Sequence, residues 1–241
     1  MKTTILLLAV FAVLCIAEAQ ENTIQDVSRS KFRFALTYGI TPMNPDQINE
    51  HIGTSNYALG SSAKSIKSLP ELGATLTLRP MKDAKVLIFR AGYASVERIF
   101  DFSQPQTSVN DTQIGTIDGT ITETYSFYPL SFGIGAATPN NDYQFQVEFI
   151  YGLAYVTEQT SFRTTDGYSA SVTRELQSPA YGIRVGGNST VNFTENVGLV
   201  LELSYRYLMF DEYEDDKALP VHFFEFPLTG ITLSAGIAVG L

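Results

Sequence analysis

Cysteine is almost absent from this sequence, whose 241 residues include only one, Cys15. That cysteine lies in an N-terminal segment with the features of a signal peptide: a positive charge at Lys2, a short apolar core at 5–16 and an A-x-A cleavage site at 17–19. We therefore predict a cleaved signal peptide at residues 1–19. The mature chain would then hold no cysteine, which excludes the disulfide frameworks common in small exported domains.

Positive charge and long apolar runs are also scarce. The chain has 16 Lys and Arg against 25 Asp and Glu, a net charge of −9, whereas nucleic-acid binding requires a basic face. After the signal peptide, no apolar run approaches the ~18 residues that a membrane-spanning helix needs. Tyrosine and phenylalanine, by contrast, are abundant, with 13 and 16 residues. This composition is typical of a β-rich protein.

One segment shows this β character most clearly, the stretch DYQFQVEFIYGLAYV at 142–156. Large apolar side chains occupy its odd positions from Tyr143 to Tyr155, and mostly polar or small residues occupy the even positions. A period of two places the two sets on opposite faces of a β-strand. The segment is long for a soluble protein, where strands of ~5–6 residues are usual.

Further segments alternate in the same way, which gives eight predicted strands. They are 31–41, 71–80, 85–96, 125–136, 142–156, 180–188, 196–208 and 230–241. Their connections are short at 80–84, 138–142 and 192–196, and long at 42–69, 98–120, 160–178 and 209–226. Short turns at one end and long loops at the other predict an all-β fold, an eight-stranded antiparallel up-and-down barrel at 31–241 after a short tail at 20–30.

The two faces of this barrel indicate what surrounds it. The less apolar face is dominated by Gly, Ala, Ser and Thr, which fill a narrow interior well but solubilise an outer surface poorly. Tyrosines gather near the loop ends of the apolar face, as in the aromatic girdle at a membrane interface; they are Tyr38, Tyr93, Tyr128, Tyr155 and Tyr207. We therefore predict a transmembrane β-barrel whose apolar face meets lipid. The alternative is a soluble lipocalin-like ligand carrier with the apolar face inside.

Six charged residues fall on the small-residue face and are predicted to point into the barrel. They are Arg33, Arg90, Glu148, Arg184, Glu202 and Arg206. Charges in a confined interior need partners, so we expect a network of Arg–carboxylate pairs, which leaves room for further acids such as Glu71 or Glu123. The network is either a polar gate for solutes or a structural plug, because side chains can fill a barrel of eight strands.

The long loops carry the remaining candidates. The acids of segment 211–216 either bind divalent cations or are simply solvated, since they lack the spacing of an EF-hand loop. Loop 42–69 opens with a helix-start pattern and is either a partner surface or an ordinary mobile loop. The two histidines, His51 and His222, lie in these loops without a clear serine-hydrolase pattern around them. We predict no catalytic residue, no cofactor and no metal site.

The last residues, SAGIAVGL, carry a sharper signal. At Ser234, Gly236, Val239 and Leu241 they resemble the C-terminal assembly signal of small eight-stranded bacterial outer-membrane β-barrels, the class of the OmpA membrane domain, OmpX and OmpW. Leu241 stands where Phe is the usual last residue. The resemblance implies an outer-membrane protein in contact with lipid and lipopolysaccharide and folded by the barrel-assembly machinery. Its turns and N-terminal tail would be periplasmic and its long loops extracellular.

The same resemblance implies a non-enzymatic role, either structural or as a narrow pore for small solutes. The alternative is a surface adhesion or binding protein that acts through loops 42–69 and 209–226. Loop deletions that abolish partner binding but leave the barrel intact would favour adhesion. Solute flux into liposomes that survives those deletions would favour transport.

Overall fold

The structure is a computed structural model that describes nine stretches of the chain. They are residues 32–42, 66–79, 84–107, 113–138, 142–194, 196–210, 213–215, 220–221 and 228–240. Within these stretches, no helix is long and apolar enough to cross a membrane. The predicted signal peptide at 1–19 and the tail at 20–30 lie outside the described residues.

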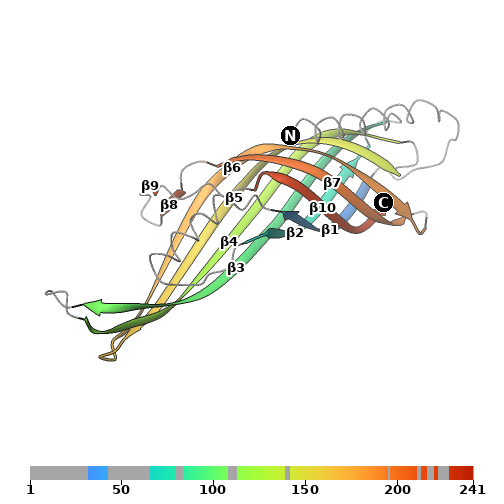
Figure 1. Cartoon of the computed structure of the whole chain (residues 1–241). Helices are drawn as coiled ribbons and strands as arrows, with labels where there is room; N and C mark the ends of the chain where they lie inside the picture. The colour runs from blue at the N-terminus through green and yellow to red at the C-terminus, as the bar shows by residue number, and fades with distance from the viewer. Residues whose placement is uncertain are drawn as a thin grey trace.

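The regular structure in these stretches is all β-strand. The strands are β1 (Phe32–Pro42), β2 (Ser68–Leu78), β3 (Lys85–Thr107), β4 (Gln113–Ala137), β5 (Tyr143–Thr164), β6 (Ser169–Asn192), β7 (Val197–Phe210), β8 (Tyr213–Asp215), β9 (Pro220–Val221) and β10 (Gly230–Gly240). All but the short β8 and β9 close into a ring in the order β1-β2-β3-β4-β5-β6-β7-β10, and each strand is antiparallel to its neighbours (Figure 1). The predicted eight-stranded up-and-down barrel is confirmed.

Strand β1 pairs with β10 to close the ring, with Phe34 opposite Val239 and Tyr38 opposite Ala235. Closure gives every strand two partners over the length of the barrel wall and leaves no open sheet edge there, so the backbone polar groups of the wall are paired. An apolar environment requires this pairing, because it offers no water to replace a missing hydrogen bond.

The barrel wall has its large apolar side chains outside and its polar side chains inside. In β5, Phe149 is 58% exposed whereas the neighbouring Glu148 is fully buried. A soluble barrel would show the opposite arrangement. The exposed apolar belt continues around the ring, for example at Leu36, Leu130 and Leu233. The alternation that predicts the strands therefore also assigns their faces correctly.

Four adjacent strands are about twice as long as the others. Strands β3 to β6 have 23, 25, 22 and 24 residues, whereas β1, β2 and β10 have 11 each. Figure 1 shows them running on together beyond the ends of the shorter strands. We call this part the four-stranded extension; it comprises residues 97–107, 113–123, 157–164 and 169–175.

The extension corrects two predictions. Segments 98–120 and 160–178 are predicted as long loops, but most of each is strand. The β5–β6 connection is a tight turn at 165–168, where Gly167 has a φ of 87° that favours glycine. The prediction fails because it recognises strands by large apolar side chains on one face. In the extension that face carries Ser, Thr and Asp, so the alternation is weaker although the backbone pairing continues.

The other two long connections lie mostly outside the described residues. In the connection predicted at 209–226, β8 and β9 form a short antiparallel pair. Strand β8 also pairs with β6, with Asp215 opposite Leu176. It therefore takes the place of β7 beside β6, since the last β7 residue paired with β6 is Phe210, opposite Ala180. In the connection predicted at 42–69, strand β2 already begins at Ser68.

Candidate functional site

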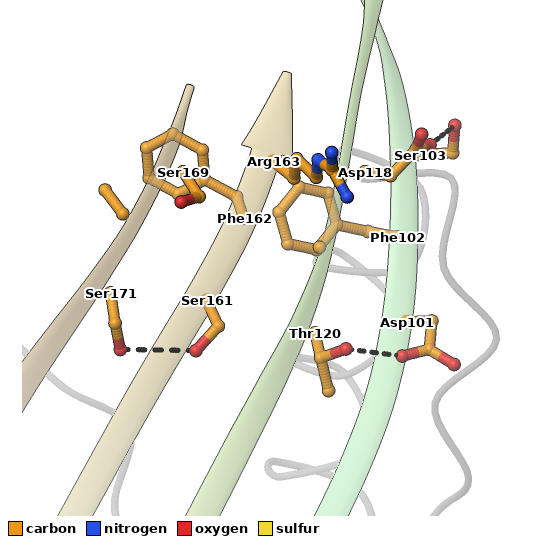
Figure 2. Close-up of a pocket in the computed structure, with 12 residues that line it drawn as sticks. Asp101, Phe102, Ser103, Asp118, Thr120, Ser161, Phe162, Arg163, Ser169 and Ser171 are labelled. Atoms are coloured by element: carbon orange, nitrogen blue, oxygen red, sulfur yellow. Dashed lines mark hydrogen bonds between the residues drawn. The ribbon is translucent and has the colours of Figure 1, made fainter. Parts of the chain in front are cut away.

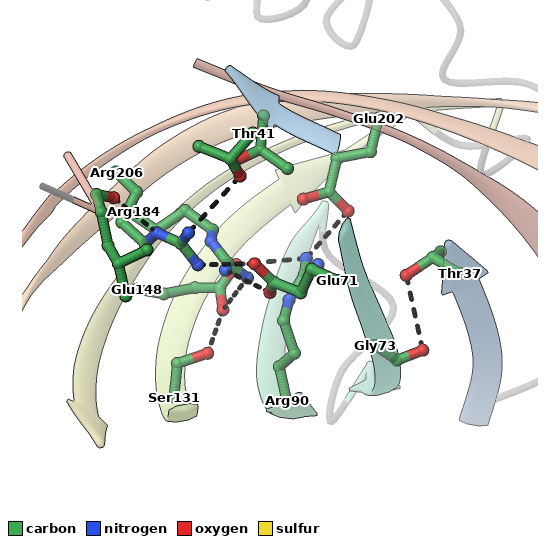
Figure 3. Close-up of polar contacts among 12 residues, drawn as sticks. Thr37, Thr41, Glu71, Gly73, Arg90, Ser131, Glu148, Arg184, Glu202 and Arg206 are labelled. Atoms are coloured by element: carbon green, nitrogen blue, oxygen red, sulfur yellow. Dashed lines mark hydrogen bonds and ion pairs between the residues drawn. The ribbon is translucent and has the colours of Figure 1, made fainter. Parts of the chain in front are cut away.

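The barrel interior holds a closed network of six charged side chains from five strands (Figure 3). They are Glu71 on β2, Arg90 on β3, Glu148 on β5, Arg184 on β6, and Glu202 and Arg206 on β7. Their three positive and three negative charges balance. All six side chains are buried, and Glu148 and Arg206 are completely so.

Each arginine of this network contacts a carboxylate at close range. Arg90 bridges two acids, with its Nη2 2.8 Å from Glu202 Oε2 and 3.3 Å from Glu148 Oε1. Glu71 in turn bridges two arginines, with Oε2 2.6 Å from Arg206 Nη1 and Oε1 3.1 Å from Arg184 Nη2. Because these acids and bases share partners, removal of one member leaves an uncompensated charge in the interior.

Neutral side chains support the charged ones. Ser131 donates a hydrogen bond to Glu148, and Gln146 Nε2 donates to Glu148 Oε1 at 3.0 Å. Arg206 Nε donates to the carbonyl oxygen of Leu228 at 3.0 Å, which ties the network to the chain just before β10. These hydrogen bonds satisfy donors and acceptors of the charged side chains that the ion pairs do not use. A buried charge is stable only when such groups have partners.

The network differs from the predicted set by one exchange. Five of the six predicted charges belong to it, but Arg33 lies near the turn end of the barrel and donates a hydrogen bond to Thr190. The sixth member is Glu71, which sequence reasoning named only as a possible additional acid. Its position at the start of the predicted strand, in phase with Gly73 and Thr75, is the signal that assigns it to the interior.

A small void lies beside these charges among the described residues. The void bordered by Glu71, Arg90, Arg184 and Glu202 has a volume of about 10 Å³. A water molecule needs ~10–15 Å³ by the same kind of measure, so the void takes one water at most. Several buried atoms near it, including Arg184 Nη1 and Ser204 Oγ, have no hydrogen-bond partner among the described residues. A single bound water would suit this environment.

An apolar cluster fills the interior on the extension side of the network. We call it the plug; its buried members are Ile66, Leu69, Ala94, Tyr125, Phe127, Ile150, Ala154, Val156, Leu176, Ala180, Leu208 and Leu228. It packs directly on the charged layer, because the Arg206 guanidinium lies 5.6 Å from the centre of the Phe127 ring. Two smaller apolar clusters, one of them Val86, Ile88 and Ala137, fill parts of the turn side. The interior is therefore layered and filled.

The five predicted girdle tyrosines all lie on the outer face of the barrel. Three of them form a chain, with ring centres 5.1 Å apart between Tyr93 and Tyr128 and 5.7 Å apart between Tyr128 and Tyr155. Tyr38 and Tyr207 are about half exposed on β1 and β7. The outward residues that follow in the direction of the extension are mostly polar on β3, β4 and β5, with Ile99 as an exposed apolar exception. The tyrosines thus mark the level at which the outer surface changes from apolar to polar.

The predicted assembly signal lies on the last strand. Ser234, Gly236 and Val239 belong to β10 and pair with β1, while Leu241 lies outside the described residues. A Cβ atom on Gly236 would collide with the carbonyl oxygen of Leu36, so this position needs glycine for barrel closure. Recognition of this C-terminal signal by the barrel-assembly machinery stays a prediction.

A second charged group crosses the base of the extension. Arg98, Glu123, Glu158 and Arg174 are direct cross-strand partners on β3, β4, β5 and β6, and we call them the charge row. Arg98 Nε donates to Glu123 Oε2 at 2.6 Å, and the Tyr125 hydroxyl donates to the same oxygen at 2.5 Å. Burial and the nearby Glu123 carboxylate raise the pKa of Glu158 above its ordinary value.

The outer face of the extension carries two polar rows beyond the charge row (Figure 2). Each row takes one residue from each of β3, β4, β5 and β6. The first is Asp101, Thr120, Ser161 and Ser171, and the second is Ser103, Asp118, Arg163 and Ser169. A hollow of about 900 Å³ at this level of the extension is lined by residues of both faces, at 101–103, 118–120, 161–163 and 169–171. We call the two rows the polar platform.

The chain is similar to several solved structures, each at low sequence identity. Ail, the attachment invasion locus protein of Yersinia pestis, is 14% identical at a TM-score of 0.32, over 86% of this chain and 99% of that one. A major outer membrane protein from Thermus thermophilus is 12% identical at a TM-score of 0.41, over 87% and 99%. The outer membrane protease OmpT from Escherichia coli is 10% identical at 0.36, over 91% and 99%. No family model and no curated protein sequence matches this chain.

The loop candidates of the sequence analysis cannot be placed. His51 and His222 lie outside the described residues, as do Asp211, Glu212 and Asp216 of the acidic segment, whereas Glu214 and Asp215 belong to β8. Within the described residues, no group of three or more His, Cys, Asp and Glu side chains is arranged to hold a metal ion. The chemistry that the described part of the chain offers is therefore ion pairing inside the barrel and hydrogen bonding on the platform.

Proposed function

We propose that this chain is a non-enzymatic outer-membrane β-barrel that serves as a closed anchor and presents the four-stranded extension outside the cell as a binding surface. It combines two roles of the sequence analysis, structural barrel and surface-binding protein. The binding surface, however, is the four-stranded extension rather than loops 42–69 and 209–226 alone. The narrow-pore role is the less favoured alternative.

The single observation that carries this proposal is the filled interior. The void among the interior charges is about 10 Å³, and the plug lies between that void and the extension. A conducting pore needs a continuous water-filled path, which the balanced network and the apolar plug do not provide. Strands β3 to β6, in contrast, build an extension that contributes nothing to closing the barrel, which is typical of a surface used for contact.

The membrane setting rests on the outer belt of the barrel. Apolar side chains from several strands are more than half exposed, including Leu36, Leu130, Ile134 and Leu233. A contiguous belt of this kind is unfavourable in water and is the normal lipid-facing surface of a membrane barrel. The proposed setting is the bacterial outer membrane, with lipid and lipopolysaccharide around the belt and the barrel-assembly machinery as the partner during folding.

The proposal is tested by removing the extension from the barrel. Residues 98–123 and 158–174 are each replaced by an Asn-Gly turn, because the flanking pairs Glu97–Thr124 and Thr157–Glu175 are already opposite each other in the sheet. Bacterial cells that display the full-length or the trimmed protein are then tested for adhesion to coated surfaces of purified polysaccharides, extracellular-matrix proteins and cultured cells. We expect adhesion by the full-length protein and its loss in the trimmed protein.

Two controls make the result interpretable. The trimmed barrel must reach the outer membrane and show the same difference in gel migration before and after boiling as the full-length protein. Both proteins are also reconstituted into planar bilayers, where we expect no sustained channel conductance. Equal adhesion of the trimmed and full-length proteins, or a steady conductance of the full-length barrel, would overturn the proposal in favour of loop adhesion or transport.

A further inference from the structure

The four-stranded extension runs on beyond the point where the barrel is closed (Figure 1). On one side of β3, the last residue that pairs with β2 is Ala94, opposite Glu71. On the other side, pairing of β3 with β4 continues to Thr107. Within the described residues, no strand pairs with the first side of β3 from Glu97 to Ser103. We call this stretch the β3 edge.

Alternate residues of the β3 edge direct their backbone N–H and C=O groups away from β4. Ala137 N donates to the carbonyl oxygen of Ala84 at 2.7 Å, so even-numbered residues of β3 exchange hydrogen bonds with β4 in this register. In agreement, Thr116, the β4 partner of Pro105, directs both its N–H and its C=O to Thr165 instead. The odd-numbered residues therefore present their backbone groups at the edge, where another strand can pair with them.

The side chains along the β3 edge are arranged symmetrically about Phe102. One position before and after it, on the outer face, lie the polar residues Asp101 and Ser103. Three positions before and after it lie the apolar residues Ile99 and Pro105, which are both exposed. Ile99 is 62% exposed, although the outer face at this level is mostly polar. A strand with this symmetry is complementary to a reversed copy of itself.

A second copy of β3 can pair with the β3 edge in an antiparallel register centred on Phe102. Asp101 of one copy then faces Ser103 of the other, and Ile99 faces Pro105. The two Phe102 side chains face each other in a non-hydrogen-bonded pair, where opposite side chains come closest. This register opposes no charges of like sign, whereas a register centred on Asp101 would oppose two carboxylates.

The antiparallel direction places the two copies in different membranes. All copies in one membrane have β3 running in the same sense, from the turns to the extension, so their β3 strands cannot become antiparallel. Phe102 follows the girdle residue Tyr93 by nine residues along β3. The girdles of two paired copies would therefore be about 60 Å apart along the strands. Such a contact links two cells rather than two neighbours in one membrane.

We propose that the β3 edge binds the β3 edge of a second copy of this chain on another cell by antiparallel strand addition. The inference rests on the proposed function and names the partner of the extension. Main-chain hydrogen bonds supply the attraction, and the facing side chains select the register. A single contact is small, but many copies face one another across two cell surfaces, and their combined avidity holds the cells together.

The test exchanges charges at Asp101 and Ser103, which face each other in the proposed register. Asp101→Lys with Ser103→Lys gives one variant two lysines at the edge, and Ser103→Asp gives another variant two acids. Bacterial cells that display the full-length protein should clump and settle, and cells that display either variant alone should lose this clumping, because like charges are opposed. A mixed suspension of the two variants should regain it, with both fluorescent labels in each clump.

The matched controls place the same charges one strand further in, on β4. Asp118 and Thr120 are the β4 partners of Ser103 and Asp101 on the same outer face, and they share hydrogen bonds with them. Asp118→Lys with Thr120→Lys, and separately Thr120→Asp, therefore add the same charges and disturb the same hydrogen bonds away from the edge. Both control variants should clump alone, as the unsubstituted protein does. Gel migration before and after boiling verifies that every variant is folded.

Ser103→Lys alone is an independent check, because it sets a lysine against Asp101 of the other copy and should speed settling. No clumping of cells with the unsubstituted protein, no recovery in the mixed suspension, or the same behaviour of edge and control variants would overturn the inference. Equal clumping by the trimmed protein would do so as well, because the contact would then lie outside the extension. If cells do not clump but still adhere to other surfaces through the extension, the proposed function stands without this partner.

Discussion

The barrel wall and the four-stranded extension are built from the same strands with opposite distributions of polarity. In the wall, β5 exposes Val147, Phe149 and Tyr151 on its outer face and buries Glu148 inside. In the extension, the outer face of the same strand carries Ser161 and Arg163, while Phe162 lies on the inner face. The pairing of the strands does not change between the two parts. What changes is the medium outside, from lipid to water, and the side chains follow it.

This comparison shows that strand pairing and surface chemistry are specified separately. The backbone ladder runs without interruption from Ala137–Gln144 to Ile117–Thr164 between β4 and β5. The tyrosines at Tyr93, Tyr128 and Tyr155 mark where one chemistry replaces the other. A strand can therefore continue from the membrane into water provided that its outer residues change at the interface.

The largest expected effect concerns the interior network. Arg206→Met keeps the volume but leaves Glu71 with one arginine fewer, and loss of one partner of a buried ion pair typically costs about 3–5 kcal/mol of folding free energy. Arg33→Met, which removes an arginine outside the network, is the control and should cost less. Urea titration in detergent, followed by gel migration of unboiled samples, measures both. Similar midpoints for the two variants would show that the network is not a cooperative unit.

A second comparison tests the change of medium directly. Phe149→Lys places a charge on the outer face of the wall, where a lysine at mid-membrane costs about 2–4 kcal/mol. Gln159→Lys places the same charge on the outer face of β5 in the extension, where a surface substitution typically changes stability by about 0.5 kcal/mol or less. Folding yield into liposomes and urea midpoints compare the two. If both lysines are tolerated equally, the belt does not meet lipid.

The charge row predicts a pH response confined to the extension. The folded-state pKa of Glu158 is raised by burial and by Glu123 opposite, although Arg174 and Arg98 oppose the shift. A carboxyl whose pKa is higher in the folded state binds its proton more tightly there, so lowering the pH through that pKa stabilises the folded extension. Hydrogen exchange at 157–164, corrected for the intrinsic effect of pH on exchange, should therefore show greater protection at about pH 5 than at about pH 7.

Glu158→Gln is the control for this response, because the amide keeps the shape of the side chain but does not titrate. It should give 157–164 equal protection at both pH values. Exchange in the barrel wall, for example at 143–151, serves as an internal reference. A pH dependence that persists in the variant would assign the response to another group.

The smallest expected effect concerns the tyrosine chain. Tyr128 contacts Tyr93 on one side and Tyr155 on the other. Tyr128→Leu keeps an apolar side chain at the interface but removes both ring contacts, each worth about 0.5–1.5 kcal/mol in other proteins. Tyr143→Leu is the matched control, because Tyr143 is an exposed tyrosine at the start of β5, at the other end of the barrel wall. A clear loss with Tyr128→Leu alone, measured by urea titration, would show that the chain acts as a unit.

The sequence is sufficient to predict the barrel but not the extension. Residues such as Phe149 and Leu130 alternate with Glu148 and Ser131, and the contrast in size and polarity identifies both the strand and its faces. Thr120 lies between Gly119 and Ile121, and Ser161 lies between Thr160 and Phe162, so large apolar side chains do not recur on one face as they do in the wall. The partner strand decides their structure, and pairing between distant segments cannot be read from local alternation.

The candidate site was predictable to a similar degree. The alternation of residues between the two faces of a strand assigns Arg90, Glu148 and Arg184 to the interior. It cannot state at which height along the barrel each charge lies, and so it includes Arg33, which sits near the turns. The platform was not predicted at all, since its residues become neighbours only when the four strands pair.

The balanced ion pairs also act as a check on strand register. Sliding one strand by two residues keeps every side chain on its proper face, so the alternation of apolar and polar residues cannot distinguish that slip from the native pairing. The same slip moves Arg184 or Glu71 by about 7 Å, well beyond ion-pair distance, and leaves a charge in the interior without its partner. Five strands contribute to the network, so an error in any one of them is penalised. The interior charges thereby favour a single alignment of these five strands.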